Sequence, residues 1–562
     1  MRSAVCLLAA LACSGPPRPS GVRAWVSGSG VEVSWDSSSK ATHRVQLADL
    51  DRGVPASEPV IVRGTRATLP GVAQGVWVDE IPGGRTAGLV SAGSSGGDGS
   101  RWQIFAPWDF RKGELTASFA QLGPGERVGV LLVNSGGRDG ARAEVAVEGA
   151  SDPAAADRAP RAALTAALPP SLHEALRERE AALALEKPAA AETQVVERRS
   201  FCVAAGLDFS RYVRKPATLA VATAHAGIYV DDADLGEYQA PDLQPLARAF
   251  EDKVWPAVTA AFGKPVDVDR DGRIAVLLTH ELGAHLNGGW LIGYFGNADL
   301  VRARDDSPGC VRGGSNHGEI LYLNDAGNAA ANGYAKADLL ASVYPATLAH
   351  EMQHLINFGR RCVERQCDGP QDVWINEALS KVAEDLAGYG WSGLGGRAEG
   401  AAYLGRAEGE VRGYDGRSLT RWEGDPIGNY QGAHSFLRLF TDRLGPELAG
   451  RVAASPPGIE GLEGALGLPL PLAMAEWATA LLLSNEEGSP WSFSGAPWSP
   501  LHDRLRHLDT RGPGALSLRQ DGIAAVTSGP GWGGPARVVV RSGEEAPPFV
   551  VVVRASASLP AR

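Results

Sequence analysis

Alternating apolar and polar positions run through the first quarter of the chain and predict β-strands. Segment 31–35 alternates with a period of two residues, and turn-forming residues flank it. A Gly/Ser-rich linker follows at 91–100, and strand patterns return beyond it, as at 128–133. The pattern therefore predicts two small β-domains, one over residues 22–90 and one over 99–150.

The remainder of the chain mixes helix and strand patterns. Residues 151–197 are rich in Ala, with Leu and paired charges, which predicts a helical linker or pro-segment. Residues 198–490 follow as one mixed domain, in which short strands alternate with helical patterns such as 243–262. Past residue 490 the chain becomes rich in Gly and Pro and then returns to strand patterns, which predicts a small β unit over 491–562.

One predicted helix, over residues 347–357, carries His350, Glu351 and His354 in the pattern H-E-x-x-H. Residues four apart lie one above the other on a helix, so the two imidazoles face the same side. Two imidazoles in this position can bind one Zn²⁺ ion, and the adjacent Glu can reach a water on the metal. We expect the helix to end at Gly359. Its apolar stripe consists of Leu348, Met352, Leu355 and Ile356.

A second predicted helix carries the segment W-I-N-E-A-L-S and runs to about Ala387. Catalytic zinc commonly takes three protein ligands and keeps one position open for water, and two His with one Glu is a known set. Glu377, in this segment, is therefore the candidate third ligand. The alternative is a Glu on a solvated helix face, where single Glu residues usually lie.

These two segments resemble the gluzincin zinc peptidases, most closely the hyicolysin-type neutral zinc metallopeptidases. The resemblance covers roughly residues 200–440, and it implies zinc bound by His350, His354 and Glu377 with Glu351 as the general base. It also implies that Glu384 is a hydrogen-bond partner behind a zinc ligand. Lys381 stands where thermolysin-type enzymes have an Asp that supports a ligand.

The resemblance implies two further parts of a peptidase site. In gluzincins the strand before the zinc helix is an edge strand on which an extended peptide pairs, which implies a substrate strand at Ile320, Tyr322 and Asn324. An interior strand is the alternative. The segment 429–433 resembles the Tyr-x-x-Gly-Ala segment of gluzincin aminopeptidases, and it implies that Tyr430 stabilises an oxyanion. A core Tyr at the start of a helix is the alternative there.

A run of carboxylates precedes the apolar segment 274–278. Asp267, Asp269 and Asp271 stand at positions one, three and five, and Gly272 stands at position six, which is how a Ca²⁺ loop begins. The twelfth position is Leu278 rather than Glu, so a complete EF-hand loop is excluded. Calcium at these three Asp residues is one interpretation, and a polar turn before a strand is the other.

Composition narrows the choice of partners. The chain has 562 residues, which predicts three or four domains at about 150 residues each. Its 44% hydrophobic and 21% charged residues are typical of a folded globular protein. The net charge of −11 argues against a nucleic acid or an anionic membrane as a partner. Protein or peptide substrates are the partners we expect.

The chain begins with one Arg and a short apolar run, which predicts a signal peptide over residues 1–20. The segment A-L-A-C at 10–13 resembles a bacterial lipobox, which implies that Cys13 is lipidated. Ordinary cleavage near Ala12 is the alternative. We expect a bacterial protein that is secreted or held at the cell surface as an outer-membrane lipoprotein, with membrane contact only through this anchor.

Four cysteines remain after the signal peptide, and an even number in an exported chain favours disulfides. Cys362 and Cys367 would close a small loop between the two helices with the zinc ligands, which leaves Cys202 and Cys310 as the other pair. A cysteine metal site is the alternative, but no His stands at zinc-finger spacing around them.

The predicted architecture is multidomain: N-terminal all-β modules, an α+β zincin (thermolysin-like) catalytic domain over 198–490, and a small C-terminal β unit. Segment 31–35 resembles the second strand of a fibronectin type III module, which implies a β-sandwich over 22–90. We expect a zinc endopeptidase in which Glu351 takes a proton from the attacking water. The alternatives are a zinc aminopeptidase, or a non-catalytic surface binding protein with a vestigial peptidase domain.

Overall fold

The computed structural model describes most of the chain in separate ranges. The predicted signal peptide, Cys13, Cys367 and most of the predicted linker lie outside them. The described residues are 20–27, 30–36, 42–49, 54–55, 59–63, 66–70, 75–81, 85–91, 102–105, 107–119, 121–122, 126–134, 139–148, 180, 182–186, 196–205, 211–284, 291–331, 333–364, 369–390, 418–422, 427–483, 493, 506–507, 514–528, 534–544 and 547–555.

The chain forms two compact units. One comprises residues 170–405 and 446–458, and we call it the histidine unit because it holds His350 and His354. The other comprises residues 1–169, 406–445 and 459–562, and we call it the sandwich unit. Among the described residues, no helix is both long and apolar enough to cross a lipid bilayer.

The sandwich unit begins with eight short strands joined in one sheet. Their order is β4-β3-β7-β8-β1-β2-β6, with β5 also paired to β3, and all pairs are antiparallel except β1 with β8. The fibronectin type III resemblance stays a prediction for this part. The strands are β1 (Ser20–Ser27), β2 (Gly30–Asp36), β3 (Thr42–Asp49), β4 (Val54–Pro55), β5 (Val60–Arg63), β6 (Arg66–Pro70), β7 (Gly75–Ile81) and β8 (Arg85–Ser91).

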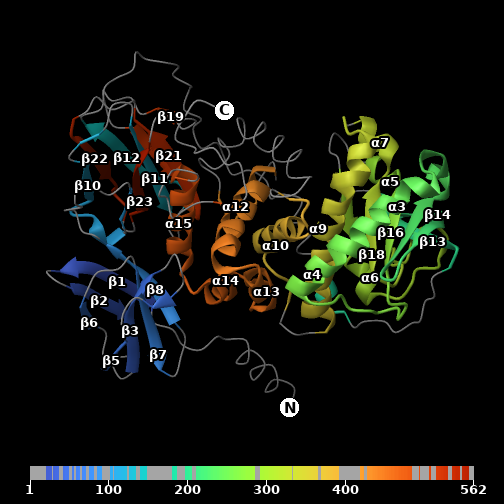
Figure 1. Cartoon of the computed structure of the whole chain (residues 1–562), viewed down its shortest axis with the longest axis horizontal. Coiled ribbons are helices and arrows are strands. Elements are labelled where there is room, and N and C mark those ends of the chain that lie inside the picture. The colour runs from blue at the N-terminus through green and yellow to red at the C-terminus, as the bar shows by residue number, and fades with distance from the viewer. Residues whose placement is uncertain are drawn as a thin grey trace. The chain divides into compact units, whose positions relative to one another are not determined.

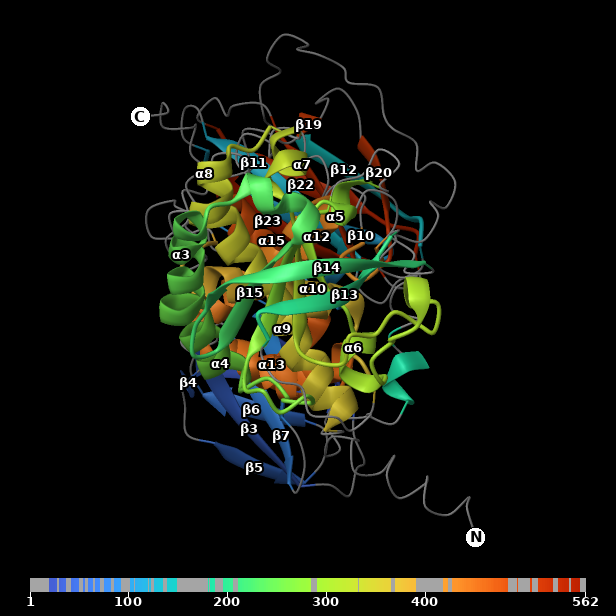
Figure 2. The same cartoon turned by 90° about the vertical axis from the view of Figure 1, so that its right-hand side faces the viewer.

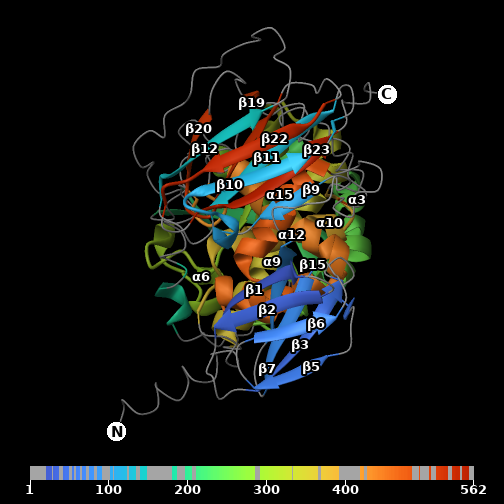
Figure 3. The same ribbon diagram turned by 90° about the vertical axis from the view of Figure 1, so that its left-hand side faces the viewer.

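A β-sandwich follows, and its strands come from two distant parts of the chain (Figure 3). One sheet has the order β10-β22-β12-β20 and the other β19-β21-β11-β23-β9, and one apolar core contains side chains from both. The strands are β9 (Trp102–Phe105), β10 (Glu114–Phe119), β11 (Arg127–Asn134), β12 (Ala141–Glu148), β19 (Arg506–His507), β20 (Gly514–Leu518), β21 (Gly522–Thr527), β22 (Ala536–Arg541) and β23 (Phe549–Ala555).

The sequence pattern treats segments 99–150 and 491–562 as separate units, and the strand pairing joins them. β11 lies between β21 and β23, and Val130 is paired with Val526 on one side and Val552 on the other. Strand alternation reveals the strands but not their partners, which lie about four hundred residues further along the chain. The histidine unit therefore falls, in sequence, between two halves of one sandwich.

Three helices complete the sandwich unit: α12 (Ile427–Leu444), α14 (Ile459–Leu466) and α15 (Leu470–Leu483). Helix α15 is buried along most of its length and packs against β11 and β23. Its Glu476 is completely buried and accepts a hydrogen bond from Arg443 Nη1 of α12 at 2.7 Å. A charge is stable at such depth because it has this cationic partner.

The histidine unit is built on a six-stranded mixed sheet with the order β13-β14-β15-β16-β18-β17. The central strands β15, β16 and β18 are parallel and β17 is antiparallel to β18, while β13, β14 and β15 are antiparallel. The strands are β13 (Arg198–Ala204), β14 (Tyr212–Ala222), β15 (Ala226–Asp231), β16 (Ile274–Thr279), β17 (Gly293–Phe295) and β18 (Ile320–Asn324).

Helices pack against this sheet, as Figures 1 and 2 show. Helix α3 contacts β14 and β15, and α9 contacts β17, β18 and α10. The α-helices are α3 (Ala240–Ala249), α4 (Trp255–Phe262), α5 (Glu281–Ala284), α6 (Ala298–Val301), α7 (Ala326–Ala331), α8 (Lys336–Asp338), α9 (Tyr344–Phe358), α10 (Val373–Leu386) and α13 (Glu447–Ala454). The 3₁₀ turns are η2 (Asp232–Glu237) and η4 (Pro308–Cys310). The π-helical turns are η3 (Phe250–Val254), η5 (Leu339–Val343) and η6 (Gly359–Val363).

The α-helix α9 ends at Phe358 and Gly359 is its C-cap residue, as predicted, but Gly359 does not turn the chain out of helical conformation. Its φ of −55° and ψ of −51° are helical, and the chain continues through η6. A Cβ at this position would lie 2.8 Å from Val266 Cγ2. The residue is therefore small because another segment packs closely against it, rather than because the helix must stop there.

Candidate metal centre

Three donor side chains meet between helices α9 and α10. His350 and His354 lie one turn apart on α9, and their ring centroids are 4.8 Å apart. Glu377 of α10 places Oε2 3.2 Å from His350 Nε2 and 3.4 Å from His354 Nε2. The ligand atoms of all three residues lie within 4.8 Å of one another.

The position of the His350 ring is set by a carboxylate on its far side. Nδ1 of His350 lies 2.9 Å from Glu384 Oε1, and the other oxygen of Glu384 accepts a hydrogen bond from Lys381 Nζ at 2.6 Å. Burial acts to lower the pKa of His350, but the hydrogen bonds with Glu377 and Glu384 outweigh it and raise that pKa to about 10. A proton held on Nδ1 leaves the lone pair of Nε2 available to a metal ion.

His354 has different neighbours. Oγ of Ser380, on α10, lies 3.2 Å from each of its ring nitrogens and donates to Gln353 Oε1 at 2.7 Å. Burial acts to lower the pKa of His354, but the carboxylates of Glu377 and Glu351 together raise it by more. Sequence reasoning did not identify Ser380, although it stands only three residues after Glu377.

Glu351 lies beside these donors without joining them. Its side chain is buried, with 8% exposed, and burial raises the pKa of its carboxyl group. The imidazoles of His350 and His354 and a backbone hydrogen bond from Phe295 act in the opposite direction. A buried carboxylate with a raised pKa and a fixed position is suited to accept and return a proton.

The donor set fits a zinc ion. Two imidazole nitrogens and one carboxylate oxygen are ligands that zinc accepts, and three protein ligands leave a position for water. The carboxylate behind His350 is the kind of partner that metal-bound imidazoles usually have. His350, His354 and Glu377 are therefore the residues that would hold the metal.

The substrate-strand prediction for Ile320, Tyr322 and Asn324 is wrong, because β18 is an interior strand. It pairs with β16 on one side and with β17 on the other. Tyr322 is buried, and its hydroxyl donates to Asp299 Oδ2 at 2.7 Å, while Asn324 donates to the carbonyl of Leu291. The edge strand on this side of the sheet is β17.

Strand β17 lies against the zinc-motif helix. Gly293 has no side chain, and a Cβ there would lie 2.7 Å from Thr347 Cγ2 of α9. Asn324 N donates to the carbonyl of Ile292 at 2.7 Å, so the alternation of an antiparallel pair turns the backbone groups of Gly293 and Phe295 away from β18. The outward-facing amide of Phe295 is the one that bonds Glu351.

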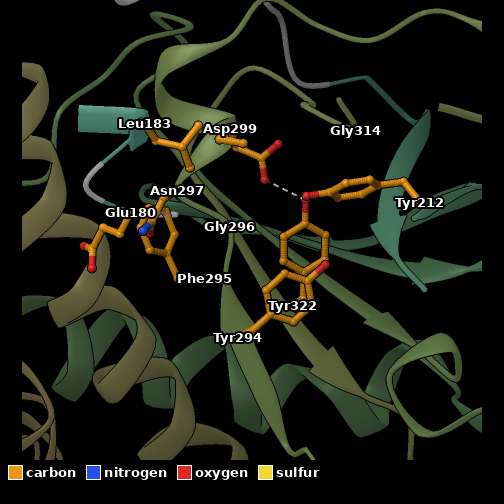
Figure 4. Close-up of a pocket in the computed structure, with 11 residues that line it drawn as sticks. Glu180, Leu183, Tyr212, Tyr294, Phe295, Gly296, Asn297, Asp299, Gly314 and Tyr322 are labelled. Atoms are coloured by element: carbon orange, nitrogen blue, oxygen red, sulfur yellow. Dashed lines mark hydrogen bonds between the residues drawn. The ribbon is translucent and has the colours of Figure 1, made fainter. Parts of the chain in front are cut away.

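A small cavity of about 90 Å³ adjoins the end of β17, as Figure 4 shows. Phe295 and Asn297 line it together with Leu183 and Glu180 from the segment before the sheet. Burial raises the pKa of Asp299, another lining residue, to about 7. The cavity thus combines aromatic walls with two carboxyl groups.

No family model matches this chain. It is 26% identical over 284 residues to the neutral metalloprotease ShpI of Staphylococcus hyicus, a match that covers 49% of this chain and 60% of that protein. The chain thus matches less than two thirds of that relative. The match supports a relationship to metalloproteases, and the narrower gluzincin and hyicolysin-type assignments stay predictions.

The solved structure of Legionella pneumophila aminopeptidase A in complex with aspartic acid also matches. The match covers 82% of this chain and 49% of the aminopeptidase chain. The TM-score is 0.26 and the sequence identity 8%, so this likeness carries no argument about the fold.

The other predicted residues belong to other elements than α9 and α10. Tyr430 belongs to the sandwich unit, in the first turn of α12, and its ring packs edge-on against the buried Trp422 at 4.9 Å. Its role as an oxyanion donor stays a prediction. Cys202 and Cys310 form the predicted disulfide, which joins β13 to η4. Cys362 is buried at the end of the zinc-motif helix.

Proposed function

We propose that this chain is a zinc-dependent endopeptidase. The observation that carries the proposal is the buried Glu351, which lies beside three converging metal donors and is bonded to the backbone of an edge strand. The similarity to a neutral metalloprotease supports it independently. When bound to His350, His354 and Glu377, zinc would polarise the peptide carbonyl and make a water acidic enough to attack it.

The side chains of the protein divide the remaining tasks. Glu351 accepts the proton of the attacking water and delivers it to the leaving amine. The Phe295 amide holds the Glu351 carboxylate in place, which limits the reorganisation needed for each transfer. Glu384 holds the ring of His350 through Nδ1.

The edge strand favours cleavage within a peptide rather than at its end. Gly293 turns its amide and carbonyl outward and Phe295 its carbonyl, while the Phe295 amide is bonded to Glu351. An extended peptide can therefore add to β17 as a further strand, mainly through the Gly293 groups. After β17 the chain continues with Gly296 and Asn297, which carry no charge that could bind a terminal amine.

A zinc aminopeptidase is the second candidate, and Glu180 is the observation that favours it. This carboxylate lines the cavity beside Phe295 and could bind the free amine of a peptide. Under this alternative, Glu180→Gln raises KM for peptides with a free N-terminus by about tenfold or more, since an ionic contact is lost. Under our proposal, Glu180→Gln cleaves peptides with blocked ends as well as the wild type does.

The test combines hydrolysis of quenched peptides, blocked and unblocked, with zinc content for the wild type and Glu351→Gln. We expect the wild type to cleave blocked peptides, both proteins to hold about one zinc, and the variant to lose at least about a hundredfold in kcat. Cleavage confined to free N-termini supports the aminopeptidase. A protein that holds zinc and cleaves nothing supports a binding role instead, and absence of zinc refutes the site.

We further propose that the protein is exported, with the Cys202–Cys310 disulfide as support, since disulfides persist in oxidising compartments. Mass spectrometry of the protein from its native cells decides between a lipidated surface form and a secreted form. A diacylglycerol mass on Cys13 indicates a surface lipoprotein, and a free N-terminus after residue 12 or later indicates a secreted protein.

A further inference from the structure

A second group of carboxylates lies where β16 and β18 begin. Asp267 and Asp269 belong to the loop before β16, and Glu319 directly precedes β18. One oxygen of each residue lies within 4.8 Å of the others. The parallel pairing of the two strands brings Glu319 to this loop, since the Ala275 amide donates to the Glu319 carbonyl at 2.8 Å.

The loop itself is folded around its carboxylates. Asp267 Oδ1 accepts from the Gly272 amide at 3.4 Å, and Asp271 Oδ1 accepts from the Arg273 amide at 2.7 Å. Arg270 and Gly272 have φ of 60° and 71°, which produces the tight turn. With the bond from the Asp271 amide to Asp269 Oδ1 at 3.3 Å, the loop uses one oxygen of each Asp.

A polar turn before β16 would account for the Asp residues of the loop, but it does not account for the buried carboxylate of Glu319. Its side chain is only 3% exposed, and Oε1 accepts from the Val268 amide at 2.8 Å. Within the described residues, its other oxygen, Oε2, is buried and has no hydrogen-bond partner. An unpaired buried carboxylate oxygen is costly, and one oxygen of Glu319 lies within 4.8 Å of those of Asp267 and Asp269, so the group implies a bound cation or a proton.

Two nearby arginines each donate a hydrogen bond to a backbone carbonyl outside the acidic group. Arg199 Nη2 donates to the Asn316 carbonyl at 3.0 Å, and Arg273 Nε donates to the Thr223 carbonyl at 2.9 Å. Burial raises the pKa of Glu319 to about 9 and that of Asp269 to about 7, and the neighbouring Asp residues add to both shifts. Arg199 opposes the shift of Asp269 without cancelling it.

We propose that Asp267, Asp269 and Glu319, whose donor oxygens converge, bind one Ca²⁺ ion. Every donor is a carboxylate oxygen, which a hard cation such as Ca²⁺ prefers, and no nitrogen or sulfur in the group would select zinc. The sequence pattern lacks a Glu at the twelfth position of the loop, and Glu319 supplies that carboxylate from the neighbouring strand instead.

The other acidic group in the same sheet serves as a contrast. Asp231, Asp234 and His280 also cluster, but Lys215 Nζ lies 3.3 Å from Asp231, and His280 Nδ1 lies 2.8 Å from Asp234. Thr279 Oγ1 donates to Asp231 as well. A cation is already present there as a side chain, so this group needs no metal.

Calcium binding would stabilise the end of the zinc-motif helix. Val266, next to the loop, packs against Gly359, and Arg360 Nη1 donates to the Phe262 carbonyl at 2.6 Å. Both contacts join the segment before the loop to the end of α9. Fixing the loop therefore restrains the helix that carries His350 and His354.

The test uses the zinc-loaded full chain, equilibrium dialysis against CaCl₂, and thermal unfolding with and without Ca²⁺. The variants are Glu319→Gln, which keeps the bond from Val268, and Asp267→Asn, which changes an exposed side chain and should therefore leave folding intact. Asp338→Asn is the matched control, because it removes one exposed carboxylate elsewhere in the unit.

We expect one bound Ca²⁺ and a rise in Tm with Ca²⁺ for the wild type and Asp338→Asn. In Glu319→Gln and Asp267→Asn, we expect at least tenfold weaker binding and a Tm that no longer responds to Ca²⁺. Without Ca²⁺, Glu319→Gln should melt no lower than the wild type, because one repelling carboxylate is gone. A wild type that binds no Ca²⁺, or variants that bind it equally well, would overturn the proposal.

Discussion

Replacing Glu384 with Gln tests whether the carboxylate behind His350 prepares it to bind zinc. The side chain is buried between two cationic or proton-donating partners, His350 Nδ1 at 2.9 Å and Lys381 Nζ at 2.6 Å. A Gln amide has one acceptor and one donor group, so it can satisfy only one of them. If the Gln oxygen faces Lys381, the Gln NH₂ group faces His350 Nδ1. The His350 proton then moves to Nε2, which is the nitrogen that should bind the metal.

The loss of zinc affinity follows from the inability of Gln to satisfy both His350 and Lys381. Removing such a partner of a metal-bound His typically weakens metal affinity about 10- to 100-fold, which corresponds to about 1.4–2.7 kcal/mol. We expect Glu384→Gln to raise the zinc Kd by this factor while circular dichroism stays that of the wild type. Hydrolysis at saturating zinc should fall less, because Glu351 is untouched.

Competition with a chromophoric chelator measures the zinc Kd directly. Lys381→Met is the matched control, because it removes the other neighbour of Glu384 and leaves the bond to His350. Its zinc Kd should stay within about threefold of the wild type, since only the indirect partner is lost. A folded Glu384→Gln protein with unchanged zinc affinity would refute the reasoning.

Three further substitutions probe the framework around the site. Gly293→Ala should lower the free energy of unfolding by about 1–3 kcal/mol in urea titrations, because its Cβ would lie 2.6 Å from the Tyr322 carbonyl oxygen; an unchanged midpoint contradicts the close packing of β17. Cys310→Ser opens a bridge across 108 residues and should cost about 2–5 kcal/mol, with the same loss in the wild type under reducing conditions. Arg443→Met leaves Glu476 without its ion pair and should cost about 3–5 kcal/mol, which a normal thermal unfolding midpoint would disprove.

Features defined by local spacing could be predicted from the sequence. His350, Glu351 and His354 fall on one helical turn, and the structure has helices over both zinc-motif segments, α9 and α10. The strands β15 and β16 likewise follow from short apolar runs between turn residues. Helical periodicity and strand alternation depend on neighbours in sequence, so no knowledge of distant partners was needed.

Features that depend on distant pairing could not be predicted. Segment 293–295 is too short to show alternation, so nothing indicated that it covers β18 and takes the edge of the sheet. The sandwich has the same difficulty, because β11 finds both partners beyond residue 520. Glu319 was missed for a related reason: its role comes from strand pairing, and the only local signal was an acidic residue directly before a buried strand.

The direction of the zinc-motif helix connects these distant features. Tyr344, at its start, donates a hydrogen bond to the Asn324 carbonyl at the end of β18, and Phe358, at its finish, packs near Phe295 of β17. The helix therefore runs back along the sheet toward the ends of the strands where Glu319 lies. Its metal donors are held between a fixed start at Asn324 and a finish that packs on Val266.

This arrangement makes a separable prediction about the two metal sites. If the calcium loop restrains only the end of the helix, Glu319→Gln should lower the Tm measured in Ca²⁺ but leave the zinc Kd within a few-fold of the wild type. Glu384→Gln should do the opposite, because it acts on one imidazole and leaves the loop intact. Zinc affinity that falls equally in both variants would show that the helix transmits strain along its whole length, and that the two sites act as one.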